Sequence, residues 1–211
     1  MIKGSLTYKE EILNAITHGI GALLAIAGVV VLVVMSSIKG TPWHIAGFAI
    51  FGSALVLLYT ISALYHAFSG MWLKSLFRKF DHMAIFILIA GTYTPFCLTV
   101  LNGWVGWTLF GIVWTCAAAG IVLKVFSTGK YEFLSTALYV AMGWVVLFFI
   151  KPVFSATSAE CFILLIAGGA FYSIGVVFFV KDKVRYFHGI WHMFVLAGST
   201  FHFFSVLTLL S

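Results

Sequence analysis

The chain alternates long apolar runs with short polar connections. Seven of these runs are each about 20 residues long, which is the length that an α-helix needs to cross the hydrocarbon core of a membrane. The runs cover residues 14–36, 44–67, 81–101, 104–126, 133–151, 159–180 and 188–210. The pattern therefore predicts an all-α integral membrane protein: a seven-transmembrane helix bundle in which residues 1–211 form a single domain.

The composition supports lipid as the surrounding solvent. Hydrophobic residues make up 63% of the chain and charged residues only 9%, whereas soluble domains carry about 25% charged residues. The first apolar run continues to about Met35, too long for the core of a secretory signal, so we expect it to stay as a span. The formal charge of +6 does not indicate nucleic-acid binding, because the basic residues lie in short connections between the spans.

The distribution of basic residues predicts the orientation of the bundle. Lys and Arg number ten on one predicted side and two on the other, and the richer side of a membrane protein is normally cytoplasmic. We therefore expect the N-terminus to be cytoplasmic and the C-terminus to lie outside. The ten are Lys3, Lys9, Lys74, Arg78, Lys79, Lys124, Lys130, Lys181, Lys183 and Arg185, and the other two are Lys39 and Lys151.

Five polar residues converge at the predicted cytoplasmic end. Ser62 and His66 are four residues apart at the end of the second run, and His188 and His192 are four apart at the start of the seventh. Residues with this spacing share one face of a helix. Asp81 opens the third run at the same depth. Ionisable groups are costly in a membrane and usually functional, so we single out this group as the candidate site.

Three imidazoles and an open position form the ligand set of a catalytic-type zinc site, although other first-row metals also accept imidazole. Asp81 could ligate the metal, hold a water molecule or accept a proton, and it could also cap a helix N-terminus. Ser62 could hydrogen-bond Asp81 or a ligand ring. The simpler alternative is a set of interfacial histidines, and the His188–His192 pair lacks the glutamate of the common metalloprotease helix.

The remaining histidines are assigned other roles. We expect His18 to make a structural hydrogen bond between helices, with approach to the site as the alternative. His202 lies fourteen residues after the first histidine of the seventh run, about 21 Å along a helix, and should pack or line a cavity. His44 is predicted to be interfacial on the opposite side. His82 points about 100° away from Asp81 and is excluded from the ligand set.

Several motifs, taken together and in this order, resemble those of the hemolysin III family, the bacterial branch of the progestin and adipoQ receptor superfamily. The similarity extends over essentially the whole chain. The motifs are Glu11 with Asn14-Ala-Ile-Thr-His18-Gly-Ile-Gly21, then Ser62-Ala-Leu-Tyr-His66, Phe80-Asp81-His82, Gly91-Thr-Tyr-Thr-Pro95 and His188-Gly-Ile-Trp-His192.

The resemblance implies a seven-helix bundle with a zinc ion (Zn²⁺) near the cytoplasmic face of a bacterial plasma membrane. It implies His66, His188 and His192 as the ligands, Asp81 acting through a water molecule, and Ser62 as part of the same polar set. The superfamily is related to alkaline ceramidases and has been proposed to contain membrane hydrolases. Its bacterial members carry the name hemolysin and have been linked to membrane homeostasis.

The leading hypothesis is a zinc-dependent hydrolase of a lipid amide or ester, with a membrane lipid as substrate or ligand. The alternative is a non-enzymatic homeostasis or sensor protein with a structural zinc. A cytolysin is disfavoured because this hydropathy leaves no soluble form, and a transporter because no charged residue lies at mid-membrane. The oligomeric state, the substrate and the metal used in the cell stay open.

Overall fold

The computed structural model describes residues 6–101, 103–128 and 130–211. This part of the chain is helical and contains no strand. Seven helical segments are long and apolar enough to cross a membrane, which confirms the predicted all-α class and the number of spans. The elements are α1 (Tyr8–Lys39), α2 (Pro42–Ala67), α3 (Met71–Leu98), α4 (Trp104–Ser127), α5 (Glu132–Gly143), η1 (Val145–Phe149), α6 (Ile150–Ala156), α7 (Ala159–Val180), α8 (Phe187–Leu207) and η2 (Thr208–Leu210).

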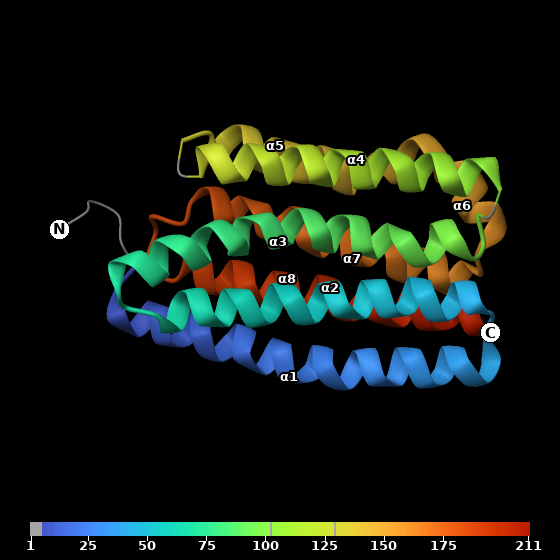
Figure 1. Ribbon diagram of the computed structural model, residues 1–211, viewed down its shortest axis with the longest axis horizontal. Coiled ribbons are helices and arrows are strands. Elements are labelled where there is room, and N and C mark those ends of the chain that lie inside the picture. The colour runs from blue at the N-terminus through green and yellow to red at the C-terminus, as the bar shows by residue number, and fades with distance from the viewer. Residues whose placement is uncertain (1–5, 102, 129) are drawn as a thin grey trace.

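The helices run along the long axis of the molecule, with α1 and α4 on opposite flanks and α2 and α3 between them (Figure 1). Helix α8 packs on α1 and α7, and α5 makes only sparse contacts with α3, α4 and α7. We call the end where α1, α3, α5 and α8 begin the histidine end; it lies on the left in Figure 1. Helix α3 is the most deeply buried span, and it contacts α2, α4, α5 and α8.

Helix α3 begins ten residues before the predicted start of the third span, because the segment 71–80 is helical although it carries three basic residues. Its first residue is Met71 and its N-cap is Gly70. Basic residues end an apolar run, but they are good helix formers and do not end a helix. Asp81 therefore lies well inside the helix, and the expectation that it caps a helix N-terminus is wrong.

The fifth span is broken rather than continuous, since α5 ends at Gly143 and a 3-10 turn precedes α6. The Tyr93 hydroxyl on α3 lies 2.6 Å from the carbonyl oxygen of Gly143 and accepts a hydrogen bond from the Val146 N–H at 3.1 Å. Backbone groups within a membrane need such partners because water is absent there. A single side chain thus stabilises the break.

The basic residues assigned to one side by the sequence lie at or near the histidine end. Lys9 is in the first turn of α1, Lys74 is in the first turn of α3, and Lys181 follows α7. Lys39 and Lys151 belong to the opposite end. Lys3 is outside the described residues. The predicted grouping by end therefore agrees with the fold.

Candidate metal centre

Three histidines from two helices meet at the histidine end. His66 in the last turn of α2 and His188 and His192 in the first two turns of α8 each offer one ring nitrogen, and these three atoms lie within 4.8 Å of one another. The side chains of His66 and His192 are buried, and His188 is half-buried. Because zinc–nitrogen bonds measure about 2.0–2.1 Å, small side-chain adjustments bring all three nitrogens to one ion. The predicted ligand set is thus brought together.

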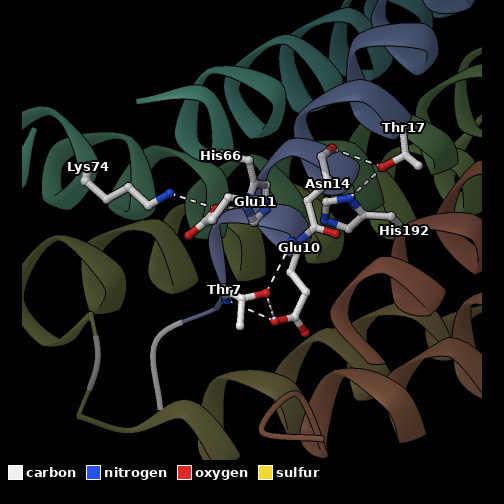
Figure 2. Close-up of polar contacts among 8 residues, drawn as sticks. All are labelled: Thr7, Glu10, Glu11, Asn14, Thr17, His66, Lys74 and His192. Carbon is white, nitrogen blue, oxygen red and sulfur yellow. Dashed lines mark hydrogen bonds and ion pairs between the residues drawn. The ribbon is translucent and has the colours of Figure 1, made fainter. Parts of the chain in front are cut away.

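Helix α1 orients the first of these histidines. The Nδ1 of His66 lies 2.7 Å from Oε2 of Glu11, and the Nζ of Lys74 lies 2.8 Å from the same oxygen (Figure 2). An ionised carboxylate only accepts hydrogen bonds, so Nδ1 carries the proton and Nε2 keeps its lone pair. Within the described residues this buried Nε2 has no hydrogen-bond partner. A metal ion is the partner that such an atom fits.

Helix α1 orients a second histidine through Thr17. The Thr17 hydroxyl donates to the backbone carbonyl of Asn14 at 3.0 Å and lies 3.2 Å from the Nδ1 of His192 (Figure 2). A hydroxyl has one proton to give, so here its oxygen accepts the Nδ1–H of His192. The Nε2 of that ring is therefore left as the metal-binding atom, as in His66.

The first turn of α1 also holds the start of α8 in place. Glu10 and Thr7 form a capping box, in which the Glu10 carboxylate accepts from the Thr7 N–H at 2.9 Å. The other oxygen of Glu10 accepts from the backbone N–H of Tyr186 at 2.7 Å. Tyr186 is the N-cap of α8 and has a φ of 65°, an unusual value for a residue with a side chain. This contact positions the helix that supplies two of the three ligands.

Asp81 and Ser62 line the same cavity as two of the ligand histidines, His188 and His192. Asp81 does not belong to the group of mutually close ligand atoms, so its role through a water molecule stays a prediction. Ser62 is buried, and no hydrogen bond joins it to Asp81 or to a ligand ring among the described residues. Both residues therefore face the site without contacting a ligand histidine through a hydrogen bond.

The expected interhelical hydrogen bond of His18 is wrong, and the alternative of approach to the site is the better description. Its ring stacks on His192 with centroids 3.5 Å apart and planes at 8°, and it meets Tyr59 edge-on. Helices α1 and α8 pack against each other, and this contact includes the face-to-face stack of the two rings. Neither ring nitrogen of His18 has a hydrogen-bond partner within the described residues.

The other histidines lie outside the ligand group, and His202 lines a cavity as expected. His202 lines the far end of the cavity, and its Nε2 lies 3.1 Å from the carbonyl oxygen of Leu165. His44 accepts the N–H of Thr41 at 3.2 Å and so caps α2 at the opposite end of the bundle. His82 lies 3.4 Å from Glu132 and takes no part in the ligand group.

A cavity of about 130 Å³ extends from the histidines into the bundle. Its walls come from α1, α2, α3, α5, α7 and α8, and side chains such as Leu88, Ile89 and Val176 make its middle apolar. A second cavity of about 50 Å³ shares the wall formed by Tyr93, Trp144 and His202. A polar end followed by an apolar passage suits a molecule with a polar group and a hydrocarbon chain.

Sequence reasoning missed the partners of the site. Glu11 was visible as a rare acidic residue beside an apolar run, which is the kind of residue that marks a function in membranes. Lys74 and Thr17 carried no such signal, because their roles depend on how the helices are rotated against each other. Lys124, counted only as a connection residue, is fully buried with its Nζ 2.8 Å from Glu132.

The comparisons with known proteins agree with this description. Over 199 residues the chain is 46% identical to "Hemolysin-3" of Bacillus cereus, covering 94% of this chain and 91% of that protein. It is also 46% identical to "Hemolysin-3 homolog" of Bacillus subtilis (strain 168), covering 95% and 94%. The human "Monocyte to macrophage differentiation factor" is 28% identical and is covered over 84% of its length, with 95% of this chain.

No solved structure matches the chain. The sequence profile described as "Haemolysin-III related" matches residues 6–203. That range contains the three histidines, Asp81, Ser62 and the residues of α1 that orient the ligands. The chain therefore belongs to the haemolysin III-related family of membrane proteins.

Proposed function

We propose that this membrane protein is a zinc-dependent hydrolase that cleaves a lipid amide or ester. The observation that carries the proposal is the group of three close histidine nitrogens, two of whose rings have their outer Nδ1 atoms held by Glu11 and Thr17. Three neutral imidazoles with further positions free suit zinc and leave room for a substrate. The polar end of the cavity would hold the acyl group, and the apolar passage its chain.

The proposal also includes the side of the membrane. The excess of Lys and Arg near the histidine end favours a cytoplasmic location for that end, with the N-terminus inside and the C-terminus outside. The site would then act on lipids of the cytoplasmic leaflet. The similarity to two Bacillus proteins supports the plasma membrane of a bacterium as its location.

Each residue of the site has a defined task in this proposal. Zinc bound by His66, His188 and His192 would supply a Lewis acid that polarises a carbonyl group and lowers the pKa of a water molecule. Asp81, from its place on the cavity wall, would orient a water molecule and accept its proton. Ser62 would hydrogen-bond the reacting group, and the surrounding apolar walls would exclude other water.

Metal analysis is the first test of this function. The protein is purified in mild detergent, and bound metal is measured by elemental mass spectrometry beside His192→Ala and Asp81→Asn. We expect about one zinc per chain in the wild type and in Asp81→Asn, and little in His192→Ala. The three proteins are then incubated with an N-acyl amide lipid and with a phospholipid, and products are identified by mass spectrometry. Product from the wild type alone supports the hydrolase.

A structural zinc is the second candidate function. The ligands join α2 to α8 while α1 contacts both, so an ion here would also fasten three helices together. A sensor or homeostasis protein would need the ion only for this structural role and not for catalysis. In this case chelation lowers the temperature of thermal unfolding, and no lipid product forms under any metal loading.

A further inference from the structure

His18 lies at the metal centre, but the proposed chemistry does not use it. It is 3% exposed, and both of its ring nitrogens are buried without a hydrogen-bond partner within the described residues. By contrast, Glu11 and Thr17, on the same helix, each hold a ligand histidine. Leaving a buried polar group without a partner lowers stability, so there must be a reason for a histidine at this position.

Packing alone does not give that reason. His18 contacts its neighbours through its ring, by stacking on His192 and by meeting Tyr59 edge-on. A phenyl ring makes both kinds of contact and has no polar atom to leave unpaired. The nitrogens of His18 are therefore costly if its role is only to support His192.

The position of His18 indicates what its nitrogens serve. The residue lines the polar end of the cavity together with Ser62, Asp81 and two of the ligand histidines. It does not belong to the group of three close ligand nitrogens. A side chain that borders the ligands and the cavity, but is not itself a ligand, is placed to contact a molecule that binds there.

We propose that His18 hydrogen-bonds the acyl group of the ligand that occupies the metal centre. A neutral imidazole offers one donor and one acceptor, so it can pair with either the carbonyl oxygen or the N–H of an amide-like group. The inference rests on the proposed function, because only a ligand that binds the metal would place its acyl group beside His18. It adds a substrate-positioning residue from α1 to the residues that hold the metal.

The test uses octanohydroxamate, a metal-binding acyl compound with a hydrocarbon chain, and the full-length protein loaded with cobalt in place of zinc. Binding is followed by the visible absorption of cobalt. In His18→Phe we expect unchanged metal content and a Kd for the probe about tenfold higher, since one hydrogen bond is lost. His18→Asn, which keeps a donor and an acceptor, should recover part of the affinity. His44→Phe, at the opposite end of the bundle and outside the cavity, is the control and should leave the Kd for the probe unchanged.

A second measurement separates ligand binding from structural support. The metal-free His18→Phe protein should unfold at the same temperature as wild type or higher, because two unpaired nitrogens are removed. A clear fall in that temperature, a loss of metal, or an unchanged Kd for the probe would each overturn the role of His18. Absence of metal from the loaded wild type overturns the proposed function as well, so the two failures are distinguishable.

Discussion

Two carboxylates at the histidine end have similar partners and different surroundings. Glu11 pairs with His66 and Lys74, while Glu132 pairs with His82, Lys124 and Arg78. The inner nitrogen of His66 faces two further histidines, whereas no metal-binding group forms around His82 in the part of the chain that the structure describes. The Glu11–His66 pair thus belongs to a candidate metal centre, whereas the Glu132–His82 pair belongs to a network that joins α3, α4 and α5.

The comparison shows that an acid–histidine pair does not define a function by itself. The role of each pair depends on what surrounds the histidine nitrogen that does not face the carboxylate, and on how deeply the partner lysine is buried. Lys124 is fully buried, so Glu132 mainly compensates a charge inside the bundle. The Lys74 side chain is 25% exposed, so Glu11 is freer to serve His66. Four variants test this division, in order of decreasing effect.

Replacing a ligand should have the largest effect. His192→Ala leaves two imidazoles, and we expect zinc affinity to fall by more than about 100-fold, beyond the range seen for residues that only orient ligands. His82→Ala is the matched control and should keep its zinc. Elemental mass spectrometry after dialysis measures both, and equal metal contents would remove the distinction between the two networks.

Removing the second carboxylate should affect stability rather than metal binding. Glu132→Ala leaves Lys124 buried without this partner, and we expect a loss of about 2 kcal/mol in the free energy of unfolding. Thermal unfolding in detergent checks the change. The double variant Glu132→Ala with Lys124→Met should recover much of the loss, and a similar fall in zinc content would contradict the assignment.

Glu11→Gln should weaken metal binding by about tenfold, since a residue that orients a ligand typically contributes 10- to 100-fold in affinity. The amide is neutral and no longer favours the proton on Nδ1 of His66. Competition with a chromophoric chelator gives the affinity. Glu132→Gln, treated in the same way, should bind zinc as the wild type does; if both variants weaken binding equally, long-range charge is the cause.

Thr17→Val should have the smallest effect, about a fivefold loss of zinc affinity, because a single neutral hydrogen bond to His192 disappears. Thr17→Ser keeps the hydroxyl and serves as the control. The same competition assay applies. A loss in Thr17→Ser as large as in Thr17→Val would show that packing of the methyl group, and not the hydroxyl, holds the ring.

The sequence was sufficient for those features that a single helix determines. Hydropathy gives the seven spans, and the four-residue spacing of His188 and His192 gives their shared face. Contacts between two helices could not be predicted from the sequence. The stack of His18 on His192 and the hydrogen bond of Glu11 to His66 require the rotation of α1 against its neighbours, which no local pattern encodes.

Helix boundaries show the same limit. The run that begins at Asp81 marks where the third helix becomes free of basic residues, but not where the helix starts, since the segment 71–80 with its three basic residues also forms helix. In the fifth span the apolar run is continuous, so it hides the break after Gly143. That break is stable because Tyr93, fifty residues earlier in the chain, pairs with its backbone.

The hydrogen bond from Tyr186 to Glu10 joins residues 176 positions apart, and this has a consequence for biogenesis. The ribosome makes α1 first and α8 last, so the buried acid of α1 waits for its partner until nearly the whole chain has been synthesised. Until then Glu10 lacks its partner on α8, whereas Glu11 can already pair with His66 of α2 and Lys74 of α3. A chain that stops before α8 would therefore lack the contact that joins the first turn of α1 to the last long helix, and assembly of this end of the bundle is complete only when synthesis is nearly finished.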